Sequence, residues 1–241
     1  RGGKPVYGVY STFVQRTYDQ LQQDLCINNN PITILTFAAS VWGMNDVTHL
    51  GIYDIPMMSN IPNLVYLAPT TYEEYIAMLD WSTEQREHPV AIRVPGAVIH
   101  GEKPTKDYGI LNKYETVQKG SGAAIIALGT FFGMGKQAAE LIEKKTGVKP
   151  TLINPVYITG IDEELLESLK KDHKAVVTLE DGILDGGFGE KIARFYGDSD
   201  MRTVNFGLKK EFLDRYDANE VLRQNGITPE QIADRAAELI K

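Results

Sequence analysis

The sequence predicts an α/β fold with two domains, each a three-layer α/β/α arrangement around a mostly parallel sheet. Short apolar, β-branched runs alternate with segments of helical periodicity along most of the 241 residues. Such alternation is typical of parallel strands covered by helices. It stops between residues 97 and 117, where Gly101, Pro104 and Gly109 break any regular pattern. We therefore expect a first domain over residues 1–96, a linker over 97–117 and a second domain over 118–241.

In the first domain, apolar runs predict strands at residues 6–10, 32–37, 63–68 and 90–94. Thr12 and Gln15 fit a T-x-x-Q capping box, which predicts a helix that begins between them and ends before Pro31. A second helix is expected from Tyr72 to about Trp81. The strand at 32–37 leads into a loop over residues 38–51, and loops after parallel strands commonly bind ligands.

The second domain is expected to repeat the alternation. Strands are predicted at residues 123–128, 149–154, 175–179 and 202–206, and helices at 134–145, 162–171 and 189–196. Peripheral strands are expected within 108–118. The sequence Thr228-Pro229-Glu230-Gln231 is a capping box with proline at the first helical position, and it predicts a terminal helix.

Composition argues against several classes of function. The net charge of −7, with no basic run, argues against nucleic-acid binding. Cys26 is the single cysteine, so neither an internal disulfide nor a cysteine-based zinc cluster is expected. No stretch has the length and apolarity of a membrane span, and we expect a cytoplasmic protein. Because the sequence opens on Arg1 and not on Met, we interpret it as a fragment or a processed piece.

Two glycine-rich segments resemble phosphate-binding loops but lack the required spacing. Gly129–Lys136 has five residues between its outer glycines, Gly129 and Gly135, and lacks a Ser or Thr after the lysine. The segment 182–189 lacks G-x-G-x-x-G spacing and follows Glu180 and Asp181, which would repel phosphate. Both segments are interpreted as turns from a strand into a helix.

Candidate binding chemistry lies at the predicted turn from the first strand into the first helix. Phe13 and Arg16 at this turn could hold a planar, anionic ligand near free backbone N–H groups. The alternative is that Phe13 belongs to the core and Arg16 is a solvated charge. His49 in the 38–51 loop is placed for proton transfer or for binding a substrate oxyanion, or it is simply a surface histidine.

The other three histidines, His88, His100 and His173, are expected at the surface. No two histidines have metal-ligand spacing, so no metal site is expected.

These residues carry a resemblance to a known family. Tyr10-Ser-Thr-Phe-x-Gln-Arg-x-Tyr-Asp-Gln20 resembles a segment of the pyrimidine-binding domain of deoxyxylulose phosphate synthases. These are thiamine-diphosphate enzymes of the transketolase superfamily. Further stretches match in the same order along the chain, at residues 47–51, 61–69, 176–180 and 186–189.

The resemblance implies an incomplete pyrimidine-binding domain followed by a transketolase C-terminal domain. It implies that Phe13 stacks on the aminopyrimidine ring of thiamine diphosphate and that Tyr10, Arg16 and Asn45 contact the substrate. His49 would contact oxygens of the donor or the acceptor. The implied reaction decarboxylates pyruvate, a 2-oxo acid, and transfers the two-carbon unit to an aldehyde such as glyceraldehyde 3-phosphate.

Three departures qualify this expectation. Ala38 and Gly96 stand where the family has the two arginines that hold the acceptor's phosphate, and Asn45, next to Asp46, replaces an aspartate. The domain that binds magnesium and the diphosphate is missing, as is the glutamate that activates the cofactor. We therefore expect activity only together with a missing N-terminal portion, in a homodimer. The alternatives are a transketolase-like paralogue with a different, non-phosphorylated acceptor, or a non-catalytic subunit.

Overall fold

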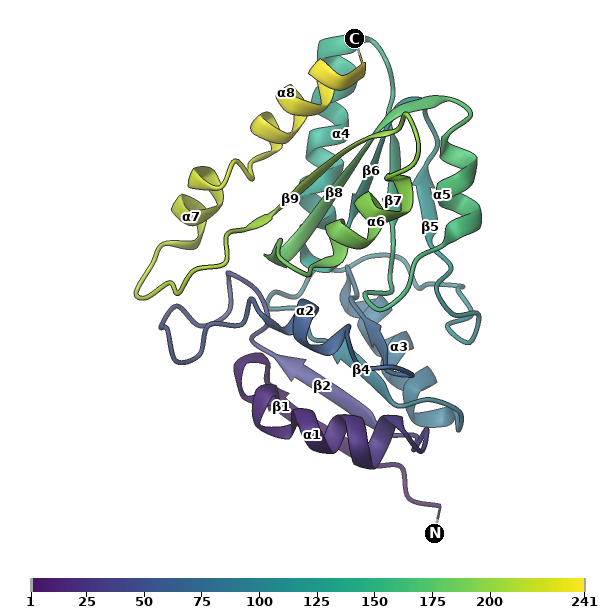
Figure 1. The fold of residues 1–241 in the computed structure, drawn as a ribbon, viewed down its shortest axis with the longest axis vertical. Coiled ribbons are helices and arrows are strands. Elements are labelled where there is room, and N and C mark those ends of the chain that lie inside the picture. The colour runs from purple at the N-terminus through teal and green to yellow at the C-terminus, as the bar shows by residue number, and fades with distance from the viewer. Residues whose placement is uncertain (1, 241) are drawn as a thin grey trace.

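The computed structural model describes residues 2–240 and shows two α/β domains stacked on each other, with the N- and C-termini at opposite ends (Figure 1). The first domain contains a four-stranded sheet in the order β1-β2-β4-β3, in which all neighbours are parallel. Its strands are β1 (Val6–Tyr10), β2 (Thr33–Phe37), β3 (Val65–Leu67) and β4 (Val90–Arg93). β1 is an edge strand, and four of its five residues are exposed.

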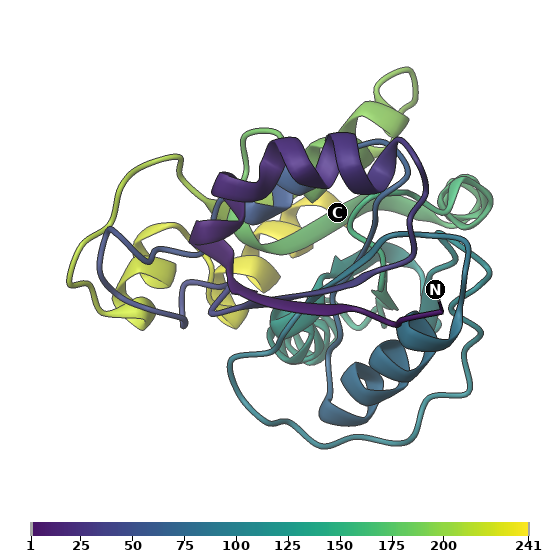
Figure 2. The ribbon, with the colours of Figure 1, turned by 90° about the horizontal axis from the view of Figure 1, so that it is seen from below.

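Helices cover both faces of this sheet, as Figure 2 shows from below. One face carries the continuous helical segment made of η1 (Ser11–Thr17), α1 (Tyr18–Gln20) and η2 (Leu21–Cys26), together with α2 (Asp54–Met58). The other face carries α3 (Tyr72–Glu84). Alternate residues of β2 divide between the faces, because Ile34 packs with the first group and Leu35 packs with α3.

The second domain contains a five-stranded sheet in the order β5-β7-β6-β8-β9. Its strands are β5 (Glu115–Gln118), β6 (Gly122–Ala127), β7 (Thr151–Asn154), β8 (His173–Ile183) and β9 (Arg202–Leu208). β5 is antiparallel to its neighbour, and the other pairs are parallel. This arrangement confirms the predicted α/β class with mostly parallel sheets.

Helices again lie on both faces of the sheet. On one face are α5 (Glu163–Leu169) and α6 (Phe188–Tyr196), which pack with Ile126. On the other are α4 (Phe132–Thr146), preceded by the turn η3 (Gly129–Phe131), and α8 (Pro229–Ile240), which pack with Ile125. α7 (Ala218–Gln224) precedes α8. Each domain therefore has the three layers that the sequence predicts.

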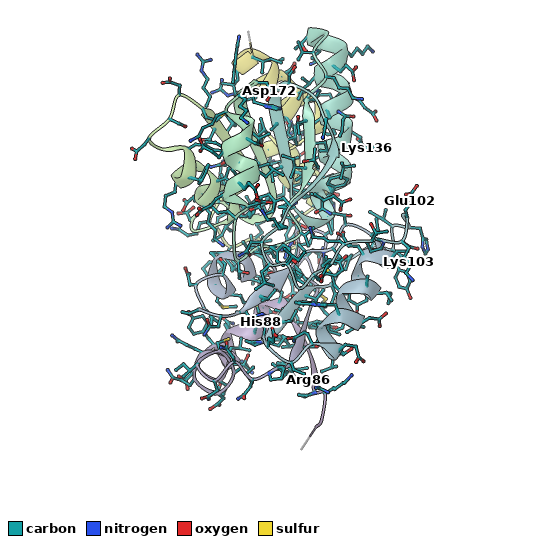
Figure 3. All side chains as sticks on the ribbon, turned by 90° about the vertical axis from the view of Figure 1, so that its right-hand side faces the viewer. Arg86, His88, Glu102, Lys103, Lys136 and Asp172 are labelled. Atoms are coloured by element: carbon teal, nitrogen blue, oxygen red, sulfur yellow. The ribbon has the colours of Figure 1, made fainter. Side chains whose placement is uncertain are left out.

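Hydrophobic packing is continuous across the two domains. A single cluster of buried residues includes Ile34 and Tyr66 of the first domain and Ile126 and Ile153 of the second. Backbone hydrogen bonds join Ala68 N to Val156 O at 2.8 Å and Ile158 N to Tyr66 O at 2.7 Å. Between β4 and β5 the described chain has neither helix nor strand. There, Glu102 and Lys103 project outward from the side of the molecule (Figure 3).

Two local predictions are wrong, and two short elements were missed. The first helical segment begins at Ser11 as a 3-10 turn, and Tyr10, not Thr12, stands at its N-cap, without a side-chain cap bond. The short helices α2 and α7 were not predicted. His173 is not at the surface: its side chain is buried, with Nε2 2.8 Å from Thr151 Oγ1 and Nδ1 3.1 Å from Leu169 O. It begins β8 inside the sheet, where its two ring nitrogens find partners.

Candidate functional site

Three rings from the sequence-predicted site meet where β1 ends. The centroids of Phe13 and His49 lie 5.1 Å apart in an edge-on arrangement, and Tyr10 lies 6.2 Å from Phe13 and 6.3 Å from His49. The guanidinium carbon of Arg16 lies 5.7 Å from the centre of the Phe13 ring. The structure thus brings together four of the five residues that the sequence analysis assigned to the site. We call Tyr10, Phe13, Arg16 and His49 the ring cluster.

The local sequence explains this geometry. Tyr10 is the last residue of β1, paired with Phe37 of β2, and keeps an extended backbone before the chain turns into η1. Ser11 and Val14 are buried in η1, so the residues between and after them remain at the outer surface. The cluster therefore lies at the carboxyl ends of parallel strands, which is the usual ligand side of such a sheet.

His49 has a carboxylate partner within its own loop. Its Nδ1 lies 3.0 Å from Asp46 Oδ1 and 2.9 Å from Thr48 Oγ1, and the Thr48 hydroxyl also bonds to Asp46. Hydrogen bonds from Thr48 and His49 lower the pKa of Asp46 to about 2. With a charged Asp46 accepting at Nδ1, a neutral His49 has its Nε2 lone pair available for a proton.

The ring cluster is accessible from outside. Tyr10 is 45% exposed, and Phe13 is half-buried, so part of its ring can contact a planar ligand. The loop over residues 38–51, which carries His49, also exposes the apolar side chains of Trp42 and Met44. The site is therefore an open face.

The fifth predicted residue, Asn45, is directed away from the ring cluster. Its side-chain Nδ2 donates to Tyr216 O at 3.5 Å, and its backbone carbonyl oxygen accepts from Arg215 N at 2.6 Å, so both partners lie in the second domain. Asp46, next to it, is the residue that contacts His49. Sequence reasoning noted Asp46 only as a neighbour, because no local signal shows which of two adjacent polar residues turns toward the histidine.

The positions of the two absent arginines differ in their surroundings. Ala38 has a left-handed backbone, and a Cβ at either Gly43 or Gly51 would lie within 2.3 Å of its carbonyl oxygen. Gly96 is exposed, with no heavy atom within 4 Å of a Cβ built on it. Neither residue offers a cation to a phosphate.

A buried ion network that the sequence analysis missed lies between the domains. Arg93 Nε donates to Asp54 Oδ2 at 2.8 Å, and Arg93 Nη2 donates to the carbonyl oxygen of Asp181 at 2.6 Å. All three side chains are at most 4% exposed. Arg93 therefore joins the two domains at this point. Only long-range packing brings these residues together, so local sequence carries no signal for the network.

The second glycine-rich turn is occupied by a carboxyl side chain of the protein itself. The Glu180 carboxylate accepts from Phe188 N at 2.7 Å and from Gly189 N at 2.8 Å, at the start of α6. Burial raises the pKa of Glu180 to about 7. A Cβ at Gly187 would lie 2.3 Å from this carboxylate, which explains the glycine. The turn is structural, as predicted, and so is the turn at Gly129, which leads through η3 into α4.

Among residues 2–240, the structure contains no group of three or more His, Cys, Asp or Glu side chains that could hold a metal ion. Within the same residues, no helix has the length and apolarity needed to cross a membrane.

The two domains match two domain families. Residues 1–98 match the transketolase pyrimidine-binding domain, and residues 112–232 match the transketolase C-terminal domain. The chain therefore belongs to the transketolase family.

Within this family, its relatives include 1-deoxy-D-xylulose-5-phosphate synthases. The enzyme of Clostridium perfringens (strain SM101 / Type A) is 36% identical over 99% of the chain, and that of Shouchella clausii is 33% identical over 100% of it. The chain spans 39% of the length of each of these relatives.

Solved structures show the same fold. A split-gene transketolase, described as an inactive β4 tetramer, superimposes with a TM-score of 0.83 at 21% identity, over 98% of this chain and 77% of that one. A Pichia stipitis transketolase in complex with sedoheptulose 7-phosphate gives a TM-score of 0.78 at 19% identity, over 99% of this chain and 34% of that one.

Proposed function

We propose that the chain is part of a thiamine-diphosphate-dependent transferase that decarboxylates pyruvate and transfers the two-carbon unit to an aldehyde. The observation that carries this proposal is the ring cluster at the carboxyl end of β1, in a chain related throughout its length to 1-deoxy-D-xylulose-5-phosphate synthases. In this proposal the chain contributes one side of the active site, and the rest of the enzyme contributes the other side.

The described residues are suited to binding one end of thiamine diphosphate, its aminopyrimidine ring. The half-buried Phe13 ring offers apolar surface to a planar heterocycle, and His49 supports the ring from its edge. Residues 2–240 show no acidic or histidine cluster for a metal. We therefore propose that Mg²⁺ and the diphosphate are bound by another part of the assembled enzyme. When bound, thiamine diphosphate supplies the electron sink for decarboxylation.

The chain's own residues would position and protonate the substrates. His49, oriented by Asp46 at Nδ1, would exchange a proton with a substrate oxygen through Nε2. Arg16 brings a positive charge next to the Phe13 ring, where it would attract the carboxylate of a 2-oxo acid. Tyr10 would line the entrance, where its side chain is partly exposed.

Ala38 and Gly96 motivate a second candidate for the acceptor, an aldehyde without a phosphate group. Without cations at these positions, and with Trp42 and Met44 exposed on the same loop, the surface favours an apolar or uncharged aldehyde over a phosphorylated one. Assays of the assembled enzyme with pyruvate and either glyceraldehyde or glyceraldehyde 3-phosphate would separate the two. A higher kcat/KM for the phosphorylated aldehyde would reject the uncharged acceptor.

The cofactor assignment is tested by Phe13→Ala in the enzyme assembled with its diphosphate-binding part. Loss of the stacking surface should weaken thiamine diphosphate binding about tenfold, which corresponds to roughly 1.4 kcal/mol. Isothermal titration calorimetry with thiamine diphosphate and Mg²⁺ measures this directly. Phe195→Ala, a partly buried phenylalanine in α6 of the second domain, is the matched control and should leave the affinity unchanged. Equal affinities of the Phe13→Ala and wild-type proteins would contradict the stacking role.

We also propose that the working enzyme is a homodimer located in the cytoplasm. Membership of the transketolase family supports the first point. Sedimentation of the assembled enzyme would test the oligomeric state, and a monomer with full activity would contradict it.

A further inference from the structure

The loop that carries His49 is bound to the second domain. We call residues 38–51 the His49 loop and residues 209–217 the strap; the strap follows β9 and precedes α7. Both views of the fold place the two segments side by side at one edge of the molecule (Figures 1 and 2). The His49 loop belongs to the first domain in sequence, so these contacts cross the domain boundary.

The strap binds the His49 loop along its backbone. Tyr216 Oη lies 2.9 Å from Val41 O and 3.2 Å from Met44 O. Asp214 Oδ1 accepts from Val47 N at 3.1 Å, two residues before His49. Because these bonds involve main-chain atoms of the loop, they fix the course of its backbone and not merely single side chains.

A second contact holds the start of the loop. Asp181 of β8 accepts from Val41 N at 3.1 Å through Oδ1 and from Thr130 through Oδ2 at 2.6 Å. The neighbouring backbone is strained, with a φ of 51° at Ala38 and 128° at Ser40. Such conformations persist only where the surroundings determine them strongly. Asp181 of the second domain is one of the residues that hold this backbone in its strained conformation.

Apolar contacts also hold the His49 loop against the second domain. The Trp42 ring meets the Phe131 ring of η3 edge-on at 5.4 Å. Val41 and Leu50, near the two ends of the loop, are buried in the hydrophobic cluster of the second domain. The loop is therefore anchored at its start, its middle and its end by residues that follow the linker.

We propose that the strap, through Tyr216 and Asp214, positions His49, so that the second domain helps to determine how the substrate that contacts His49 is bound. Tyr216 and Asp214 are positioning residues: they contact the backbone of the His49 loop and no reacting atom. Released from the strap, the loop would move His49 relative to the Phe13 ring, 5.1 Å away. The kinetic part of this inference rests on the proposed function, whereas the structural part does not.

The structural part is tested by hydrogen exchange of the 241-residue chain. Tyr216→Phe removes the hydroxyl that bonds to Val41 O and Met44 O, and exchange of amides within residues 38–51 should become about fivefold faster, as for the loss of one hydrogen bond. Tyr196→Phe is the matched control, because its hydroxyl bonds to Leu166 O within the second domain. Asp214→Ala, at an exposed position, is a second variant that removes the acceptor of Val47 N. Unchanged exchange of the loop in both strap variants, or equal acceleration in Tyr196→Phe, would overturn the proposal.

The kinetic part is tested in the assembled enzyme. Tyr216→Phe should raise KM about fivefold for the substrate that contacts His49, either pyruvate or the aldehyde, while KM for the other substrate stays within about twofold of the wild-type value, because losing one hydrogen bond at the loop is a small local change. A general loss of stability would not separate the two substrates in this way. Faster loop exchange with both KM values unchanged, or raised equally, would reject the role in substrate binding. A wild-type enzyme without turnover of pyruvate and any aldehyde would contradict the proposed function, and the exchange experiment would still decide whether the strap holds the loop.

Discussion

Replacement of Arg93 by methionine should strongly destabilise the protein, because it leaves two carboxylates without their buried cation. Arg93 is 4% exposed, and the side chains of Asp54 and Asp181 are fully buried. The substitution removes the bonds of Nε to Asp54 Oδ2 and of Nη2 to Asp54 Oδ1, together with the bond of Nη2 to Asp181 O. Methionine fills a similar volume, so the loss is mainly electrostatic. Breaking a buried ion pair from one side costs about 3–5 kcal/mol, a large part of the stability of an ordinary domain.

The penalty should depend on pH. Burial raises the pKa of Asp181, and Arg93 opposes that rise, so its removal raises the pKa further. A carboxyl whose folded-state pKa lies above its unfolded value of about 3.9 contributes stability that is present below that value and is lost as the pH rises through the folded-state pKa. The variant should therefore lose more stability at pH 8 than at pH 5.

Urea unfolding followed by tryptophan fluorescence at both pH values measures the effect. Arg86→Met, at an exposed arginine on the surface of the first domain (Figure 3), is the matched control and should change little. Arg93→Met combined with Asp181→Asn should recover part of the loss at pH 8. A loss below about 1 kcal/mol for Arg93→Met at pH 8 would refute the reasoning, since that is the range of an exposed pair.

Two further predictions concern stability. Gly51→Ala should cost about 1–3 kcal/mol in thermal or urea unfolding, because its Cβ would lie 2.2 Å from Ala38 O, whereas Gly96→Ala, with open space, should cost much less. Equal losses in the two variants would show that the close approach is not what requires Gly51. Glu180→Gln should make stability less dependent on pH between 5 and 8: burial raises the pKa of Glu180 to about 7, so the wild-type protein loses this contribution as the pH rises toward and through 7. Unfolding curves at several pH values would measure the slope, and an unaltered slope in the variant would contradict this account.

Periodicity and turn residues were sufficient to predict the fold, because each strand and long helix has its own apolar pattern. Thr228 illustrates the success, since its Oγ1 accepts from Gln231 N at 3.3 Å at the start of α8. Thr12 illustrates the limit. It has the same local signature, but the chain enters its helix earlier, where Ser11 and Val14 are buried. Tertiary packing overrides the capping pattern there.

The part of the candidate site that lies in one short sequence motif could be predicted from the sequence. Tyr10, Phe13 and Arg16 lie within one short segment, and His49 follows a neighbouring strand, so the sheet topology brings them together. The contacts of Arg93 with Asp181 and of Tyr216 with Val41 join residues 88 and 175 positions apart. No local sequence pattern indicates contacts between residues so far apart along the chain, so these contacts appear only when the domains are packed together.

The edge strand β1 has a practical consequence for work with this chain. Its outer edge has no strand partner among residues 2–240, and Val6, Tyr7 and Tyr10 expose apolar surface along it. Free backbone donors and acceptors beside apolar side chains form a template on which a further strand can assemble. A solution of this chain alone is thus expected to be prone to self-association through β1. A lysine at Val6 would introduce the charge by which natural proteins protect such edges, and it would leave the sheet's interior unchanged.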